Sequence, residues 1–243
     1  MKAMIFAAGL GTRLRPLTDD RPKALVSVAG APLLAHTIRN LQSFGFDNFV
    51  VNAHHFASRI VEYLHSEDNF GSHIEVSVEK DQPLETGGGI RKAEPLLKGD
   101  GKFFVHNVDI ISNLDVNRMI ASAPADALST LLVSERKTSR YFLFNDDMRL
   151  VGWTNVDTGE VKSAFEDLDV NSCRKLAFGG VHVMSDGVFP LMKDWPEKFS
   201  IVDFYLQMSK DYPVYGYMQE DLKLIDVGKL STLREAEDYL LSR

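Results

Sequence analysis

Short apolar runs and amphipathic segments alternate along the first half of the chain. Residues 3–8 (AMIFAA) form a continuous apolar run, which is typical of a strand buried on both faces. Residues 32–44 carry apolar side chains at helical spacing, which predicts an amphipathic helix. The same two patterns recur, predicting strands at 48–53, 74–78 and 102–108 and helices at 57–65 and 89–97. Strands that alternate with helices at this pitch indicate βαβ units and a parallel sheet.

The second half of the chain is less regular. Asn145-Asp146-Asp147 is a polar turn between two apolar runs, so residues 140–154 are predicted to form a hairpin. Further strands are predicted at 127–133, 176–183, 214–218 and 222–227, and a helix at 231–241. No repeat or linker separates the two halves. We therefore expect one α/β domain over residues 1–243, whose C-terminal part adds strands and a lid to the same sheet.

Composition narrows the function classes. The chain has 243 residues with 27 basic and 34 acidic side chains, which gives a net charge of −7. This acidity disfavours a general nucleic-acid binder, although a few local cations still suffice for a small phosphorylated ligand. No apolar run approaches the roughly 20 residues that span a bilayer. Cys173 is the only cysteine, so there is no disulfide framework, and we expect a reducing, cytoplasmic location without membrane partners.

The loop after the first predicted strand inverts this acidic balance. Gly9 and Gly11 let the backbone approach a ligand closely, and free N–H groups in such a loop bind anions. Four cations follow within eleven residues: Arg13, Arg15, Arg21 and Lys23. The dinucleotide fingerprint is not met, because Leu14 stands where its third glycine belongs, and the P-loop pattern has no match. The loop therefore favours phosphate binding over a plain strand–helix turn.

Four motifs together resemble the sugar-1-phosphate nucleotidyltransferases. Residues 9–23 (GLGTRLRPLTDDRPK) are similar to the signature of that family, and residues 83–90 (PLETGGGI) to its second nucleotide loop. Asn107-x-Asp109 resembles its metal-binding aspartate motif, and residues 225–228 (IDVG) resemble its late metal motif. The resemblance implies a mostly parallel mixed sheet of Rossmann-like, GT-A-like type with helices on both faces. It also implies a nucleotide-binding half at about 1–110 and a sugar-binding and lid half at about 111–243.

The implied reaction is attack of a sugar-1-phosphate oxygen on the α-phosphorus of a nucleoside triphosphate, with release of pyrophosphate. The protein then needs no nucleophile of its own, because aligning and neutralising two polyanions is sufficient. Arg13 and Lys23 are expected to be catalytic through their charge. Three successive glycines from Gly87 are expected to contact the base and to open a helix whose N-terminus favours phosphate. The expected nucleotide-binding residues are Ala8, Gly9, Gly11, Thr12, Asn52, Glu79, Glu85, Thr86 and Gly88.

Two carboxylates are candidates for a metal site. Asp109 follows a predicted central strand, and Asp226 ends a later strand. Carboxylates at distant strand ends suit Mg²⁺, with phosphate oxygens and waters completing the octahedron. Asp226 has an alternative role as a cap of the last helix. The chain departs from the family pattern at Val108, where glycine is usual before the metal aspartate, so we expect an altered acceptor pocket.

The sugar site is the least specified part of the pattern. Asn107 is expected to hold a sugar hydroxyl, and Gly179 to lie in the strand beneath the sugar. Glu166 is expected to accept from a sugar hydroxyl. Arg140 is expected to meet a sugar carboxylate such as a lactyl group, on charge complementarity alone.

The run 84–90 and the compact length are most similar to family members that use UTP and N-acetylmuramate 1-phosphate. GTP with mannose or heptose 1-phosphate remains open, and so does CTP with phosphocholine. Other classes are an inactive nucleotide-sugar-binding regulatory protein and a Rossmann dehydrogenase. The inactive protein is disfavoured because Arg13, Lys23, Asp109 and Asp226 are all present. The dehydrogenase is disfavoured because Leu14 replaces the third glycine of its fingerprint. The expected partners are the two small substrates, in a monomer or small homo-oligomer. From the length of 243 residues we also expect no C-terminal β-helix domain of the kind that larger relatives carry.

Overall fold

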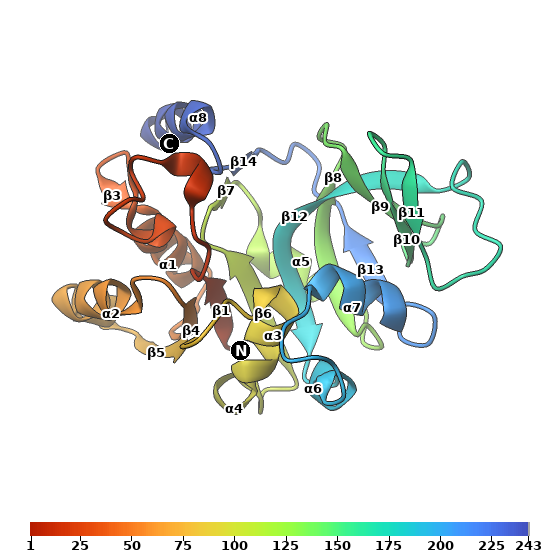
Figure 1. The fold of residues 1–243 in the computed structure, drawn as a ribbon, viewed down its shortest axis with the longest axis horizontal. Coiled ribbons are helices and arrows are strands. Elements are labelled where there is room, and N and C mark those ends of the chain that lie inside the picture. Colours follow the sequence, from red (N-terminus) through yellow and green to blue (C-terminus); the bar gives the residue numbers. More distant parts are fainter. Residues whose placement is uncertain (243) are drawn as a thin grey trace.

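A mixed sheet of ten strands runs through the computed structural model, which describes residues 1–242 (Figure 1). The main path has the order β11-β10-β9-β12-β6-β1-β4-β5, and β8 and β13 extend the sheet beyond β12. The bounds are β1 Ala3–Phe6, β4 Asn48–Ala53, β5 His73–Val78, β6 Lys102–Asn107, β8 Ser129–Ser134, β9 Arg140–Phe144, β10 Leu150–Asn155, β11 Glu160–Lys162, β12 Arg174–Ser185 and β13 Val214–Tyr217.

The strands of the N-terminal half are parallel. β1 pairs with β4 on one side and with β6 on the other, and β4 pairs with β5. The register places Phe6 beside both Asn52 and Asn107. The carboxyl ends of these strands therefore meet at one edge of the sheet, which is where open α/β sheets bind ligands.

The long strand β12 joins this parallel part to an antiparallel part. It pairs with β6 along one side, and along the other side with β9 and then β8. The register shifts between Phe178 and His182, and Gly180 within this bulge has a φ of +71°. The bulge bends the strand at the point where it passes the ligand-binding edge.

Helices cover both faces of the sheet, because alternate residues of its central strands point to opposite sides. Ala3 and Ile5 of β1 pack in one hydrophobic cluster, and Met4 packs in the other. The first cluster includes side chains of α1 (Leu33–Ser43), α2 (Ala57–Ser66), α5 (Val116–Ser122) and α8 (Leu230–Leu241). The second includes side chains of α3 (Glu85–Lys92), α4 (Glu94–Leu97), α6 (Val188–Met192) and α7 (Ile201–Met208).

Two short strand pairs complete the architecture. β7 (Ile110–Ser112) pairs with β14 (Leu224–Asp226), and β2 (Ser27–Val28) pairs with β3 (Ala31–Pro32). Helix α8 then packs on β14 and β2, and the C-terminal end lies on the opposite side of the molecule from the N-terminus (Figure 1). Short 3-10 turns lie at Thr12–Leu14 (η1), Lys23–Leu25 (η2) and Asp68–Gly71 (η3).

The predicted α/β class with helices on both faces is confirmed, whereas several boundaries differ. The helix predicted at 89–97 begins at Glu85 and breaks at Ala93 into α3 and α4. The pattern did not predict β7, α5, α6 or α7, which are short or apolar on most sides. Within residues 1–242, no helix has the length and apolar character needed to cross a bilayer.

Candidate active site

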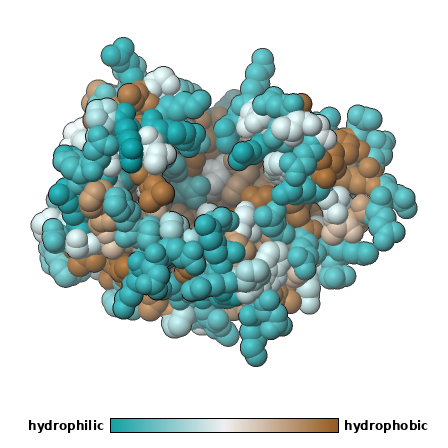
Figure 2. All heavy atoms as spheres, in the orientation of Figure 1, coloured by the Kyte–Doolittle hydropathy of each residue, from teal (hydrophilic) through white to brown (hydrophobic). Residues whose placement is uncertain are grey.

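A cavity of about 460 Å³ lies at the carboxyl ends of β1, β4, β5 and β6. The space-filling view shows the molecule hollowed near its centre, between the part that carries α1 and α2 and the part that carries β8 to β11 (Figure 2). The predicted residues that line the cavity are Ala8, Gly9, Gly11, Thr12, Arg13, Lys23, Asn52, Glu79, Glu85, Thr86, Asn107 and Asp109. Residues far apart in the sequence therefore form one wall of polar groups.

The glycine-containing loop is fixed at both ends. Gly11 has a φ of +64°, and a Cβ there would lie 2.9 Å from Thr18 Cγ2, so only glycine fits without strain. The Thr18 hydroxyl donates to the Gly11 carbonyl at 2.9 Å. Leu14 is fully buried and anchors the loop in the core. These contacts therefore hold the loop in shape.

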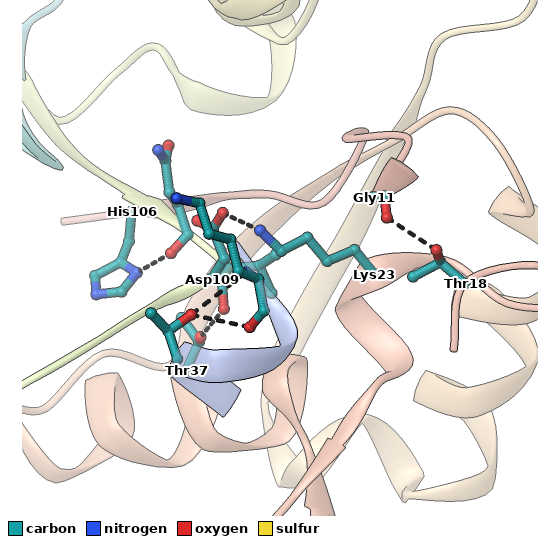
Figure 3. Close-up of polar contacts among 10 residues, drawn as sticks. Gly11, Thr18, Lys23, Thr37, His106 and Asp109 are labelled. Atoms are coloured by element: carbon teal, nitrogen blue, oxygen red, sulfur yellow. Dashed lines mark hydrogen bonds and ion pairs between the residues drawn. The ribbon is translucent and has the colours of Figure 1, made fainter. Parts of the chain in front are cut away.

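Only two of the four loop cations line the cavity. Lys23 is 8% exposed, and its ammonium forms an ion pair with the carboxylate of Asp109 (Figure 3). The Arg13 guanidinium lies over Gly228, where a Cβ would come within 3.0 Å of Nη2. Arg15 and Arg21 instead pair with the exposed carboxylates of Asp19 and Asp20. The positive charge of the cavity therefore comes from Arg13 and Lys23.

Two aspartates approach one another through the short pair of β7 and β14. Asp226 lies opposite Ile110, and the amide of Val227 donates to the Asp109 carbonyl at 2.9 Å. Asp226 Oδ1 is buried and has no hydrogen-bond partner among residues 1–242. A buried carboxylate oxygen without a partner is costly unless a cation takes it. These two carboxylates fit a divalent cation, whose remaining ligands would be phosphate oxygens and water because the described residues contain no cluster of three acidic, His or Cys ligands.

Asn52 and Glu79 form a buried pair at the other end of the cavity. Glu79 is 2% exposed and accepts hydrogen bonds from Asn52 Nδ2 and from the Leu84 amide, both at 2.8 Å. Asn52 Oδ1 is buried without a partner in the described structure. Gly89 leaves room for this pair, because a Cβ there would lie 2.9 Å from Glu79 Oε1.

The second nucleotide loop reaches the cavity only through its first residues. Glu85 and Thr86 line the cavity, whereas Gly88 does not, because its Cα faces the Glu197 carbonyl. The amides of Gly87 and Gly88 donate to the Phe199 carbonyl at 2.9 and 3.3 Å. A protein carbonyl therefore already occupies the amides of Gly87 and Gly88, and the phosphate site expected at this helix N-terminus stays a prediction.

The structure brings one of the four expected sugar residues to the cavity. Asn107 lines it, and its amide packs on Gly180, where a Cβ would lie 2.7 Å from Nδ2. Gly179 packs against Leu132 and Leu224 instead.

Arg140 and Glu166 lie elsewhere. Arg140 is exposed at the start of β9 and is not part of the cavity wall. Glu166 lines a second cavity of about 660 Å³ beside Asp146 and Lys210. Glu166 was expected at the sugar site by resemblance and Arg140 on charge complementarity alone. The long loop 163–173 carries Glu166 to the second cavity.

Several cavity residues were not expected from their side chains. Phe6, Leu10, Leu14, Pro83, Val108 and Gly228 also line the cavity. Val108 is 4% exposed and packs with the cluster of the α1 face, which shows how a β-branched residue is accommodated before Asp109. Gly228 could have been predicted from the sequence, because it belongs to the matched motif at residues 225–228. Its lack of a side chain leaves room for the Arg13 guanidinium.

Burial sets the charge state of the histidine beside the site. His106 is 2% exposed, and Nδ1 pairs with the carbonyl of Asn107. Burial lowers the pKa of His106 to about 4, so the ring is neutral near pH 7. In the close-up the ring points away from Lys23 (Figure 3). The cavity therefore gains no cation from this histidine.

The loop, the two cations and the paired aspartates at one sheet edge define a nucleotide-processing α/β enzyme, and comparison with known proteins identifies its family. The chain belongs to the nucleotidyl transferase family, whose sequence profile matches residues 2–243. It is 37% identical over 226 residues to an N-acetylmuramate alpha-1-phosphate uridylyltransferase of Caulobacter vibrioides, covering 90% of this chain and 89% of that one. It is also 39% identical over 123 residues to a mannose-1-phosphate guanyltransferase of Gibberella zeae, covering 50% of this chain and 34% of that one. The chain is therefore a sugar-1-phosphate nucleotidyltransferase.

Solved structures agree with the fold. HddC from Yersinia pseudotuberculosis, complexed with GMP-PN, has a TM-score of 0.77 at 22% identity and covers 98% of this chain and 99% of its own. A putative glucose-1-phosphate thymidylyltransferase from Bacillus anthracis has a TM-score of 0.81 at 17% identity, covering 98% and 94%. At these identities the likeness supports the architecture alone.

Proposed function

We propose that the chain transfers a uridylyl group from UTP to N-acetylmuramate 1-phosphate, forming the UDP-sugar and pyrophosphate. The observation that supports this substrate pair is the 37% identity to a uridylyltransferase of that name over nearly the full length of both chains. The cavity is consistent with two phosphorylated substrates, because its wall combines a glycine loop with Arg13, Lys23 and Asp109. Asp226 is not part of that wall but lies directly behind Gly228, which is.

The reaction is an exchange of one phosphorus–oxygen bond for another. An oxygen of the sugar phosphate forms a bond to the α-phosphorus, and the bond from the α-phosphorus to the β-phosphate oxygen breaks. Pyrophosphate leaves with the electron pair. Neither step needs a protein nucleophile, so the residues act by alignment and charge.

Each cation has a separate place in this scheme. In this proposal Arg13, which lines the cavity beside Gly228, holds the triphosphate and the departing pyrophosphate. Lys23, buried next to Asp109, neutralises the charge that develops at the α-phosphate. Its burial strengthens this interaction, because the local dielectric is lower than in water.

The two aspartates would hold a divalent cation, and we propose Mg²⁺. Asp109 and the unpartnered Asp226 Oδ1 would be its protein ligands. When bound, the ion supplies charge neutralisation for the phosphate oxygens and orients them for displacement. Asp109 also fixes the ammonium of Lys23, so this carboxylate has two roles at the cavity floor.

A second candidate is transfer of a guanylyl group. It is favoured by the relatives that are named mannose-1-phosphate guanyltransferases, although they match about half of this chain. Uracil and guanine both present a ring N–H, so an acceptor such as Asn52 Oδ1 does not separate them.

A pyrophosphate-release assay tests both candidates. Four nucleoside triphosphates are crossed with a panel of sugar 1-phosphates, with Mg²⁺ or with a chelator. We expect the highest kcat/KM for UTP with N-acetylmuramate 1-phosphate. Preference for GTP with mannose 1-phosphate would replace the first proposal by the second, and no release with any pair would refute both.

A further inference from the structure

The three glycines of α3 lie at positions where helix stability argues against them. Glycine is the least favourable helix residue apart from proline, yet Gly87, Gly88 and Gly89 follow one another within the eight residues of α3. Two of the three face the segment 192–201, which runs from the end of α6 to the start of α7. We call this segment the strap.

The strap occupies the space that side chains would fill. A Cβ on Gly87 would lie 2.3 Å from Phe199 Cε2, and one on Gly88 would lie 2.4 Å from the Glu197 carbonyl oxygen. Both distances are shorter than real Cβ contacts, so neither position accepts alanine unless the strap moves. The glycines are therefore explained by contact with the strap.

Hydrogen bonds tie the same surfaces together. The Phe199 carbonyl accepts from the amides of Gly87 and Gly88, and the Phe199 amide donates to the Leu84 carbonyl at 3.2 Å. The Ile201 amide donates to Thr86 Oγ1 at 3.0 Å. The strap thus holds the backbone on both sides of Glu85, a residue with a φ of +61°.

Arg91 closes the opposite side of the strap. Its Nη1 donates to the carbonyls of Met192 at 3.1 Å and Trp195 at 2.6 Å, and its Nη2 donates to that of Pro196 at 3.0 Å. The guanidinium also lies 5.4 Å from the centre of the Phe199 ring. The rings of Trp195 and Phe204 lie 4.9 and 6.3 Å from the Phe199 ring between centres. One guanidinium therefore ties three carbonyls of the strap to α3.

The strap itself does not line the cavity, whereas the residues that it fixes do. Pro83, Glu85 and Thr86 are cavity residues, and each is within two positions of a backbone group bound by the strap. We infer that the strap positions the nucleoside triphosphate indirectly, by fixing the backbone of residues 83–86. This inference rests on the proposed nucleotidyl transfer, and it assigns Gly87 and Gly88 to strap docking instead of base contact.

A double-mutant cycle with Gly87→Ala and Phe199→Ala distinguishes contact of Gly87 with the strap from contact of Gly87 with the nucleotide. We expect each single variant to raise KM for UTP about tenfold, with kcat and KM for the sugar 1-phosphate within about threefold of wild type. The double variant should match Phe199→Ala alone, because removal of the ring makes room for the new methyl group. If Gly87 contacted the nucleotide, the two effects would multiply, and that result would overturn the inference.

Two further variants make the test independent of whether Gly87→Ala folds. Arg91→Gln disturbs the strap from its outer side and should also raise KM for UTP, so unchanged KM in both Arg91→Gln and Phe199→Ala would overturn the inference even if Gly87→Ala does not fold. Phe46→Ala is the control, because Phe46 is a buried ring packed on Phe104 in the other cluster, at the opposite end of the sheet. It should lower the thermal midpoint and leave KM for UTP unchanged.

Nucleotide titration separates this inference from the proposed reaction. Calorimetric titration with UTP and with GTP gives dissociation constants without turnover. A wild-type protein that binds nucleotide but makes no product would refute the proposed reaction, and the strap variants would still be judged by their dissociation constants. Equal dissociation constants in wild type and in the strap variants would refute the positioning role.

Discussion

Gly180 packs against Asn107 at the edge of the cavity, and replacing Gly180 with alanine tests whether Asn107 holds a hydroxyl of the sugar 1-phosphate. The residue has a φ of +71°, where an L side chain costs roughly 1–2 kcal/mol. A Cβ there would lie 2.7 Å from Asn107 Nδ2 and 3.2 Å from Ile110 Cγ1. Ordinary contact begins at 3.4 Å, so the Asn107 amide must shift by several tenths of an ångström.

This shift sets the expected size of the effect. A displacement of about 1 Å in a substrate-positioning group lowers rates by about 100-fold, so Gly180→Ala should lower kcat/KM for the sugar 1-phosphate by about 10- to 100-fold. KM for UTP should remain near the wild-type value. Steady-state kinetics with each substrate varied in turn measures both quantities, and urea denaturation measures the loss of stability.

Gly30→Ala is a matched control for backbone strain. Gly30 has a φ of +81° and no atom within 4 Å of a new Cβ, so it carries the same conformational cost without the clash. Both variants should lose a similar free energy of unfolding from strain, and only Gly180→Ala should lose sugar-dependent activity. A Gly180→Ala enzyme with kcat/KM for the sugar within about twofold of wild type would refute the placement of Asn107.

Three other predictions follow from the site and the core. Lys23→Met should lower kcat by about 100- to 1,000-fold, as loss of one transition-state donor does. Lys92→Met, on the exposed side of α3, is the control and should leave kcat unchanged. Near-normal turnover of Lys23→Met would show that Lys23 has no part in the mechanism. Chelation should abolish pyrophosphate release and added Mg²⁺ should restore it, with Asp226→Asn requiring at least about tenfold more Mg²⁺; full activity after chelation would refute the metal site. Burial lowers the pKa of His182 in the folded protein to about 3, whereas the same ring in the unfolded chain takes up a proton below about pH 6.5. Protonation therefore favours the unfolded chain, and the free energy of unfolding should fall by up to about 5 kcal/mol as the pH drops toward 3. Urea denaturation at several pH values should show a shallower dependence in His182→Gln, and an identical dependence would contradict this account.

The N-terminal half of the fold was largely predictable because its physical signals are local. The runs at 3–8 and 48–53 are apolar enough to be read as buried strands, and β1 and β4 lie within those bounds. The carboxyl ends of such strands meet at one edge in any parallel sheet, so the convergence of Asn52, Asn107 and Asp109 followed from the pattern.

The remaining features depend on contacts that sequence spacing does not encode. The glycines at 87 and 88 indicated a close approach, but the approaching groups are the Phe199 ring and the Glu197 carbonyl, more than a hundred residues away. Glu166 lies on a long loop whose path depends on the β9–β10 arm, and resemblance alone placed it near the sugar. Short elements such as β7 carry too few residues for a period to be recognised.

The pairing of β7 with β14 has a consequence for the order in which the enzyme becomes complete. Asp109 leaves β6 early in the chain, yet the strand that brings Asp226 and Gly228 to it is the last one in the described structure. Chains are synthesised from the N-terminus, so a growing polypeptide can arrange the phosphate loop and Lys23 long before its second carboxylate exists. An unfinished or C-terminally clipped chain would thus retain the nucleotide-side strands without the pair of aspartates. Under the proposed mechanism, activity therefore depends on a strand of three residues that is made long after the phosphate loop.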